Sequence, residues 1–418
     1  MLATMKSALD TDWRAVRAEF PVTERCVYLN TGWSGPSSRA VVRAMAERLE
    51  REAFDGPTTP AVRHEKALLV RSVRQRIADF IGADLDEVAI GYTTTEGVNT
   101  VLRGIGLQPG DEVITCNLEH NSIMVPSYVG RRRDGVTLKI VRFASTETAA
   151  EMLDAFEEAM SPRTKLLLLS HVSFNRGTRL PMREICAVAH ARGALVAVDA
   201  AQSVGHIDFD VREKGCDFLA LPGHKWLLGP DGAGALCVGR EHIERLEPLA
   251  VAHGANREYD YDGRFDEERA SIHKFELTTH SGPVLAGLAA AIDFIAGIGM
   301  PAVEARCLEL ADRFVAGLEA INGARITSPL DPSVRSGIVT FTVGDYNPGS
   351  TAAALYATAG IVARVCNDKR VRACFSIFND ESDVDRTLEA IEQLAARGLP
   401  GGTLSEAEYK AQTLEAED

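Results

Sequence analysis

The chain has 418 residues, of which 45% are hydrophobic, and its formal net charge at pH 7 is −14. A chain of this length and composition can bury a large core, which we expect to be divided between two domains. The negative charge argues against nucleic acid and against an anionic membrane surface as binding partners.

The cysteines, the histidines and the N-terminal residues exclude further classes of protein. The eight cysteines are scattered without a CxxC pair, which is typical of the reducing cytoplasm rather than of a disulfide framework. The ten histidines lack HExxH-type spacing, so we expect no metal site. The first residues lack the apolar core of a secretory signal. Residues 283–300 are strongly apolar but include Asp293 and three glycines, which favours a buried helix over a membrane span.

The N-terminal part of the chain begins with a short amphipathic helix, predicted from the helical spacing of Trp13, Val16 and Phe20. A strand then ends in a turn rich in glycine and proline at residues 32–36, and residues 38–81 have a helical pattern.

A second strand, at residues 87–92, is followed by three threonines that lead into a helix. Hydroxyls and free N–H groups at a helix N-terminus form an anion site. An ordinary threonine N-cap is the alternative interpretation.

The central part of the chain alternates strands and helices. Strands are predicted at residues 111–116 and 164–173, and Pro181 and Gly193 bound a predicted helix at residues 180–192. That helix links two strands in a βαβ unit, which makes the sheet parallel.

Two short apolar runs, residues 194–198 and 218–221, have the pattern of buried parallel strands. Asp199 follows the first run and Lys225 follows the second. Because ligands bind outside the carboxyl ends of such strands, we expect both side chains to face one crevice.

A lysine and a carboxylate in one crevice match the needs of pyridoxal 5'-phosphate (PLP). The lysine can form a Schiff base, and the carboxylate keeps the pyridinium nitrogen protonated. Either residue alone is more often a solvated loop residue. Their combination with Gln202, Ser203 and His224 favours a PLP site.

These residues resemble the class V aminotransferase family of fold-type I PLP enzymes. The family includes cysteine desulfurases, selenocysteine lyases, cysteine and cystine C–S lyases and isopenicillin N epimerases. The resemblance is carried by Asp199-Ala-Ala-Gln-Ser-Val-Gly-His206, by Pro222-Gly-His-Lys-Trp226 and by Gly229-Pro-Asp-Gly-Ala-Gly234. Weaker matches run from Tyr28 to Arg386.

The resemblance implies an α/β fold of fold type I with two domains. Residues 29–290 form the large PLP-binding domain, whose mostly parallel sheet is flanked by helices. Residues 1–28 and 291–400 form a smaller α/β domain, with strands at 336–343, 361–365 and 371–377 and helices through 308–318 and 388–396. Residues 401–418 form an acidic tail that we expect to be mobile.

The resemblance also implies the cofactor contacts. Lys225 forms the Schiff base and removes the Cα proton, Asp199 pairs with the pyridinium nitrogen, and His120 of Glu119-His120 covers one ring face. The predicted phosphate contacts are Thr94, Thr95, Ser203 and His224, and the predicted contacts of the phenolic oxygen are Asn175 and Gln202. Thr93 and Pro222 depart from residues common in relatives.

Two further segments resemble family motifs for the partner subunit and the substrate. Thr279 of Phe275-Glu-Leu-Thr-Thr279 implies a homodimer in which this side chain reaches the partner's phosphate; an ordinary loop threonine is the alternative. Asn30 and Trp33 are predicted to line the substrate pocket. Arg372 is our first choice for the substrate carboxylate and Arg364 the second, because a guanidinium binds a carboxylate in bidentate fashion; surface arginines on an edge strand are the alternative.

The reaction depends on residues beyond the cofactor. A cysteine desulfurase needs a nucleophilic thiolate, and the short interval from Arg364 to Arg372 offers only Cys366, which we interpret as a strand-end cysteine. We therefore predict a cytoplasmic PLP-dependent C–S lyase or desulfurase-like enzyme for a sulfur-containing amino acid. An aminotransferase or an epimerase is the alternative. A PLP carrier or sulfur-relay scaffold would not need the set of Lys225, Asp199 and His120.

Overall fold

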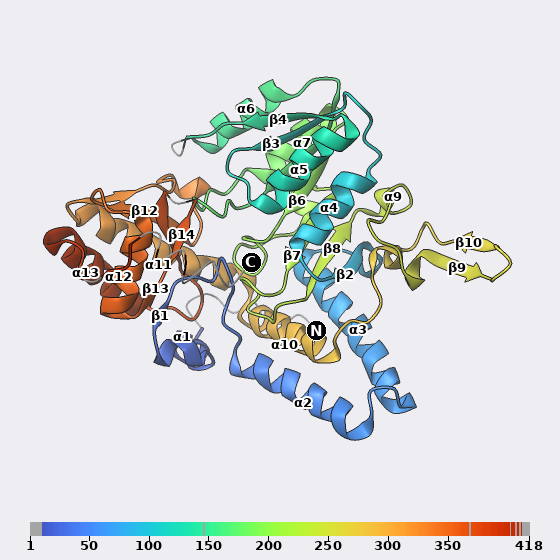
Figure 1. The fold of residues 1–418 in the computed structure, drawn as a ribbon, viewed down its shortest axis with the longest axis horizontal. Helices are drawn as coiled ribbons and strands as arrows, with labels where there is room; N and C mark the ends of the chain where they lie inside the picture. Colours follow the sequence, from blue (N-terminus) through green and yellow to red (C-terminus); the bar gives the residue numbers. More distant parts are fainter. Residues whose placement is uncertain are drawn as a thin grey trace.

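The computed structural model describes residues 11–401 apart from 145, 146 and 368, together with residues 403–405, 408 and 411. Within these residues, a seven-stranded sheet and a four-stranded sheet organise two halves of the molecule (Figure 1). Of the predicted tail at 401–418, 12 of the 18 residues fall outside the described residues.

The larger sheet has the strand order β2-β8-β7-β6-β5-β3-β4. Its strands are β2 (Val88–Gly91), β3 (Glu112–Cys116), β4 (Thr137–Val141), β5 (Thr164–Ser170), β6 (Leu195–Asp199), β7 (Phe218–Pro222) and β8 (Gly234–Val238). All pairs from β7 to β4 are parallel, whereas β8 is antiparallel to both neighbours. The predicted parallel sheet is confirmed, and its register sets Ser170, Asp199 and Ala220 side by side.

Helices cover both faces of this sheet. Three lie on one face: α4 (Thr94–Gly104), α5 (Asn121–Asp134) and α9 (Arg240–Ile243). The other face carries α3 (Pro60–Ile81), α6 (Ala149–Ala159), α7 (Met182–Ala191), α8 (Val211–Lys214) and α10 (Gly282–Ile298). In β5, Leu167 and Leu169 pack on one side while Leu166 and Leu168 pack on the other. This burial on both faces explains the unbroken apolar run of the strand.

The smaller sheet is antiparallel with the order β11-β12-β15-β14. Its strands are β11 (Ala324–Ile326), β12 (Ile338–Val343), β14 (Arg364–Cys366) and β15 (Arg370–Cys374), and its helices are α11 (Met300–Ala320), α12 (Pro348–Ala359) and α13 (Glu381–Arg397). Near the N-terminus, β1 (Val27–Tyr28) pairs in parallel with β13 (Ile361–Val362). The N-terminal segment is thereby tied to the C-terminal half.

A third group of buried residues joins the two halves. Phe20, which follows α1 (Trp13–Ala18), packs with Phe378 of the C-terminal half and belongs to one core cluster with Trp226, which follows Lys225. Arg17 also donates to the Asp383 carboxylate at 2.7 Å. The segment after Lys225 is therefore anchored where the two halves meet.

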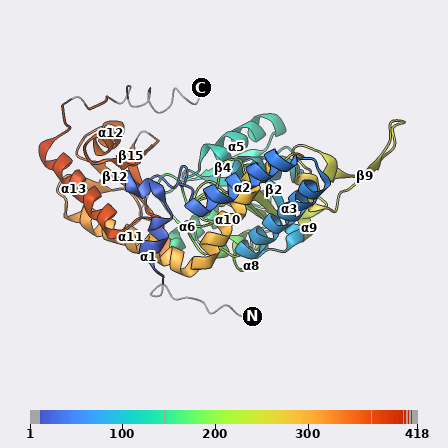
Figure 2. The same ribbon diagram turned by 90° about the horizontal axis from the view of Figure 1, so that it is seen from below.

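A hairpin of β9 (Asn256–Tyr259) and β10 (Phe265–Glu267) extends away from the body of the molecule (Figures 1 and 2). Tyr259, Tyr261 and Phe265 on this hairpin are exposed. Exposed aromatic side chains on a projecting arm are typical of a contact surface.

Several predicted boundaries differ from the structure. The helical stretch 38–81 is two helices, α2 (Arg39–Asp55) and α3, because Gly56 adopts a positive φ of 81° and Pro60 begins the second helix. The strand predicted at 164–173 ends at Ser170, and the strand predicted at 361–365 is divided between β13 and β14. Residue 290, the predicted end of the large domain, falls inside the continuous helix α10.

Among the described residues, no single helix is long and apolar enough to cross a membrane. Only α10 and α11 together pass that test, and they are bent by 81° relative to each other.

We expect Phe314→Ala to destabilise the smaller half by about 3–5 kcal/mol, because it would leave a cavity in a core that cannot close fully. Phe314 is fully buried and packs on Phe341 and Phe375, with ring centroids 5.6 and 5.0 Å away. Urea denaturation measures the change. Tyr356→Ala, on the exposed surface of α12, is the matched control; equal losses in both variants would contradict this packing.

Candidate functional site

The carboxyl ends of β5, β6 and β7 open into a cavity of about 310 Å³. Most of the predicted site residues line it: Trp33, Thr94, Thr95, His120, Asp199, Gln202, His224, Lys225 and Arg364. A second, larger cavity of about 630 Å³ lies between α6, α7 and α8 and the turn at residues 332–334, and none of the predicted site residues line it. The chemistry of the lining, rather than cavity size, therefore identifies the candidate site.

Lys225 lies in a tight loop directly after β7. Its carbonyl oxygen accepts from the Leu228 N–H at 3.0 Å, and the Gly35 N–H donates to the neighbouring His224 carbonyl at 2.7 Å. A Cβ atom at Gly35 would overlap the Lys225 carbonyl, so only glycine allows this approach. Burial lowers the pKa of Lys225 to about 8, against the attraction of Asp199. Such a lysine is partly neutral near pH 7.

Asp199 ends β6 and is only 3% exposed. Its Oδ1 accepts from the Ala201 N–H at 2.8 Å, and its Oδ2 accepts from the Ser122 hydroxyl at 3.0 Å. Burial raises the pKa of Asp199, while the charge of Lys225 and these hydrogen bonds act in the opposite direction. The structure thus brings the predicted acid and the predicted lysine to one cavity.

His120 is held in one orientation at the start of α5. Its Nδ1 accepts from the Ser122 N–H at 3.1 Å, so the proton of the neutral ring belongs on Nε2. Its ring contacts Phe174 edge to face, with centroids 4.9 Å apart. Burial, followed by the charges of Lys225 and the two arginines, lowers the pKa of His120 to about 4. The imidazole is therefore neutral at physiological pH.

The start of α4 forms an anion site at the cavity. Thr93 is the N-cap, and its hydroxyl accepts from the Glu96 N–H at 3.1 Å. The N–H groups of Thr94 and Thr95 lie in the first helical turn and have no intrahelical acceptor. The Thr94 hydroxyl is buried without a hydrogen-bond partner, and Nδ1 of His224 also lacks a hydrogen bond, although it lies 3.7 Å from Oδ1 of Asp231. The φ of Thr93 is −150°, ordinary extended backbone, so its departure from glycine causes no strain.

Gln202 is already engaged by its neighbours. Its Nε2 donates to the Gly32 carbonyl at 2.7 Å, and its Oε1 accepts from the Trp226 indole at 2.8 Å. One N–H remains for a ligand. Asn175 lies outside the cavity lining, buried, with an unpartnered Oδ1.

The two arginines occupy paired positions on neighbouring strands. Arg364 of β14 is opposite Arg372 of β15, so both side chains lie on one face of the sheet. Arg364 lines the cavity, and its guanidinium carbon is 3.5 Å from the Trp33 ring centroid.

The Arg372 side chain is more deeply buried than that of Arg364. It is 1% exposed and donates to the Phe174 carbonyl at 2.9 Å and to Oδ1 of Asn30 at 3.2 Å. Because β15 has neighbours on both sides, the alternative of a surface arginine on an edge strand is wrong for Arg372.

Ser203 and Thr279 are not brought to the cavity within this chain. Ser203 is fully buried, and its hydroxyl turns back to the Ala200 carbonyl at 3.4 Å instead of facing the predicted phosphate position. The prediction for Ser203 is therefore not supported, because the turn after β6 directs this side chain inward. Thr279 adopts a positive φ of 73°, a strained conformation for a β-branched residue.

Two further side chains belong to the site although no sequence motif indicated a role for them, those of Ser122 and Glu119. Ser122 lies between His120 and Asp199: its backbone N–H donates to Nδ1 of His120, and its hydroxyl donates to the Asp199 carboxylate. Glu119 accepts from the Ser170 N–H at 3.0 Å, and burial raises its pKa to about 7. Their position directly after the end of β3 was the available signal, because that strand ends at the same edge as β6.

A group with metal-ligating side chains lies at Asp217, Glu241 and His242, at the opposite end of β7. The Asp217 carboxylate already accepts from His242 and His190 at 2.9 Å each. The absence of a metal stays a prediction.

Three comparisons describe what this chain is similar to. The family model described as aminotransferase class-V matches residues 27–387. A probable cysteine desulfurase from Methanothermobacter thermautotrophicus is 31% identical, over 92% of this chain and 98% of the relative. An isopenicillin N epimerase from Streptomyces clavuligerus is 30% identical, with the same coverage of both chains.

A solved cystine C–S lyase, in complex with its reaction product cysteine persulfide, superposes with a TM-score of 0.83. It is 25% identical and covers 89% of this chain and 99% of its own. A variant of that lyase was solved with glycine covalently linked to its PLP cofactor.

We expect Ser122→Ala to raise the pKa of Asp199 further, because the charged carboxylate loses a hydrogen bond that stabilises it. Carbon-13 NMR of labelled aspartates in the apoprotein measures this pKa. Ser127→Ala is the matched control, since that hydroxyl bonds to the Ile123 carbonyl on the same helix. An unchanged pKa in Ser122→Ala would contradict the role of this hydroxyl.

Proposed function

This chain belongs to the aminotransferase class-V family, and from that premise we propose that it is a PLP-dependent enzyme that cleaves the C–S bond of cysteine or a related sulfur amino acid. The observation that carries the proposal is the single cavity shared by Lys225, Asp199 and His120. A binding module would not need a buried lysine with a lowered pKa beside a buried carboxylate.

The side chains at this cavity fit PLP. The phosphate would be held at the N-terminus of α4 by Thr94 and Thr95. The buried Thr94 hydroxyl has no hydrogen-bond partner and could donate to a phosphate oxygen. Asp199 would hold the pyridinium proton, and Lys225 would form the covalent link. When bound, PLP supplies an electron sink for the electron pair left when the substrate loses its Cα proton.

The protein side chains at the cavity would transfer the proton and hold the cofactor in position. Lys225, with its pKa near 8, can accept the Cα proton and return it within one turnover. His120 is neutral and has a fixed tautomer, and its uncharged ring would cover one face of the cofactor. Ser122 connects His120 to Asp199, because its backbone N–H donates to Nδ1 of His120 and its hydroxyl donates to the Asp199 carboxylate.

The arginine pair supports recognition of an α-carboxylate. Two like charges at directly opposed positions repel each other, and an anionic group between them relieves that repulsion. Arg364 lines the cavity and would contact the carboxylate, while Arg372 supplies positive charge and holds Asn30 and the Phe174 carbonyl in place.

The position of Cys366 favours elimination over desulfuration. Its thiol is buried, bonds to the Phe174 carbonyl and does not line the cavity. It ends β14, four residues before β15 begins at Arg370, in a hairpin too short for a mobile loop. A thiolate that must reach the substrate sulfur would need such a loop, whereas elimination needs no nucleophilic cysteine.

Reconstitution of the apoprotein with PLP should accelerate as the pH rises through about 8, because only the neutral amine of Lys225 attacks the cofactor. Roughly a tenth of this amine is neutral at pH 7, far more than for an ordinary lysine with a pKa near 10.4. The growth of visible absorbance measures the rate. Lys225→Ala should show no such absorbance, and the exposed Lys165→Ala is the control; a rate independent of pH between 6 and 9 would count against the assignment.

Cys366→Ser should retain most of the wild-type activity on cysteine or cystine, with pyruvate as the carbon product. Chromatography of the products separates pyruvate, alanine and keto acids. Alanine as sole product together with an inactive Cys366→Ser variant would identify a desulfurase. Racemised substrate would favour an epimerase, an alternative supported by the 30% identical isopenicillin N epimerase. A keto acid formed without release of sulfur would favour an aminotransferase.

We also propose a homodimer with shared sites. The strained backbone at Thr279 costs about 1–3 kcal/mol, and such strain persists mainly at functional positions. The exposed aromatic residues of the β9–β10 hairpin offer a contact surface for a second copy.

Co-expression of Lys225→Ala and Thr279→Ala subunits should restore activity to about a quarter of the sites, because one site of each mixed dimer keeps both residues. The test requires that dimers made only of Thr279→Ala subunits have little activity. A monomer in sedimentation at working concentration would refute shared sites.

The remaining expectations stay proposals. We place the boundary of the large domain at Gly299 instead of residue 290, because α10 is continuous and packs on α2 and α3.

All eight cysteines are described and all are free thiols, which supports a reducing, cytoplasmic location. The net charge of −14 supports an enzyme that binds neither nucleic acid nor membrane.

A further inference from the structure

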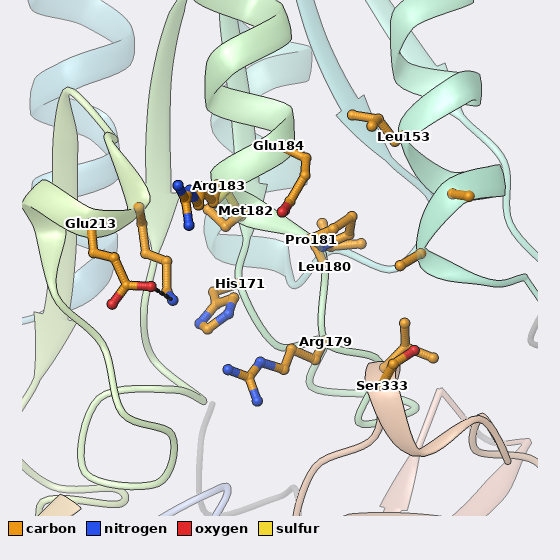
Figure 3. A pocket seen from close by; sticks show the side chains of 14 residues that line it. Leu153, His171, Arg179, Leu180, Pro181, Met182, Arg183, Glu184, Glu213 and Ser333 are labelled. Carbon is orange, nitrogen blue, oxygen red and sulfur yellow. Dashed lines mark hydrogen bonds and ion pairs between the residues drawn. The ribbon is translucent and has the colours of Figure 1, made fainter. Parts of the chain in front are cut away.

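The cavity of about 630 Å³ lies between the large sheet and the C-terminal half, away from Lys225. Its wall combines α6, the segment from His171 to Glu184, α8 and the 3-10 turn Pro332–Val334. Figure 3 shows the His171 ring in the middle of this wall, between Arg179 and Arg183.

His171 is a buried polar side chain without a partner. It is 1% exposed, and its Nδ1 forms no hydrogen bond. Its ring is fixed edge to face against Phe209, with centroids 5.0 Å apart. His171 lines the cavity, and a buried imidazole nitrogen without a partner is costly unless a ligand or water completes it.

The N-terminus of α7 opens into the same cavity. Its N-cap is Pro181, which offers no capping side chain, so the N–H groups of Met182, Arg183 and Glu184 lack acceptors from the helix or its cap. This end of the ten-residue helix therefore carries positive potential at the cavity wall, which the Glu184 carboxylate in the first turn offsets only in part because it leaves the backbone N–H groups without a bonded acceptor.

The charged side chains at this wall are biased toward cations. Arg179, Arg183 and Lys214 line the cavity together with Glu184 and Glu213. Arg179 is held by Glu304 at 2.6 Å and Lys214 by Glu213 at 3.1 Å, whereas Arg183 has no partner among the described residues. Burial lowers the pKa of His171 well below its ordinary value, and the charges of Arg179 and Lys214 lower it further.

We propose that this cavity binds a phosphate dianion, either free or carried by a small organic molecule. The α7 amides and Arg183 would bind the phosphate oxygens, and His171 would donate or accept the remaining hydrogen bond. The volume beyond one phosphate leaves room for an organic part. This site is separate from the cavity of the proposed function and does not depend on it.

The proposed phosphate site is connected to the cavity that contains Lys225 by the backbone at the end of β5. Ser170 lines the catalytic cavity and His171 lines this one, so consecutive residues face opposite sides. The His171 N–H donates to the Asp199 carbonyl at 3.1 Å.

The test is isothermal titration of the PLP-loaded protein, in which the cofactor already occupies the anion site at α4. The probes are inorganic phosphate and glycerol 3-phosphate, each added up to about 20 mM, where even a millimolar site fills. Arg183→Gln removes the guanidinium that would bind the phosphate, and His171→Phe removes the imidazole that would complete its hydrogen bonds. Arg63→Gln, an exposed arginine on α3 away from this cavity, removes the same charge as a control.

We expect saturable binding that weakens roughly tenfold or more in Arg183→Gln and is unchanged in Arg63→Gln. Tighter binding of glycerol 3-phosphate than of inorganic phosphate would assign the remaining volume to an organic part and also supports the proposal. Lack of saturable binding by either probe would overturn it. Equal affinity in wild type and Arg183→Gln would overturn it as well, and because that side chain is exposed, misfolding would not explain the result.

Discussion

The site depends on one buried pair of opposite charges, Asp199 and Lys225, held at the ends of adjacent parallel strands. Burial raises the pKa of the carboxyl group and lowers that of the amine, while each partner partly restores the charge of the other. Neither charge would be stable at this depth alone. The parallel pairing of β6 and β7 delivers both side chains to the same edge, where a ligand can lie between them.

Close backbone packing keeps this pair in place. The segment after Lys225 is pressed between the Gly35 turn and the loop containing Gly205, and at both positions a Cβ atom would overlap its backbone. Trp226 then bonds to Gln202 and joins the core cluster that connects the two halves. The lysine is thus fixed by the junction of the two halves and not by its own loop alone.

The smaller sheet completes the site by supplying positive charge. Its strands β14 and β15 carry Arg364 and Arg372 at opposed positions, and β1 continues into the turn that holds Asn30 and Trp33. These arginines lower the pKa of both His120 and Lys225, so the two halves share one electrostatic environment. An anionic substrate would bind where the halves meet, which is a common place for ligand sites.

The sequence predicted the ends of β6 and β7 to within one residue, because each is a short buried apolar run whose polar successor lies at the sheet edge. Asp199 and Lys225 followed from that rule, whereas His120 was implied only by the family resemblance. Ser203 did not follow from it, because the direction of a side chain within a turn depends on backbone angles that periodicity does not reveal.

The burial of Arg372 also escaped prediction. Alternation along β15 indicated one face for the arginine, but only the pairing of β12 and β14 on both sides places it inside. The bond from Ser122 to Asp199 joins residues 77 positions apart, a contact that no local pattern reports.

The most direct test of this account is the position of the covalent link to PLP. Borohydride reduction of the loaded protein, followed by digestion and mass spectrometry, should place the label on the peptide containing Lys225. A label on any other lysine, with Lys225 unmodified, would contradict the pairing of Lys225 with Asp199 on which the account depends.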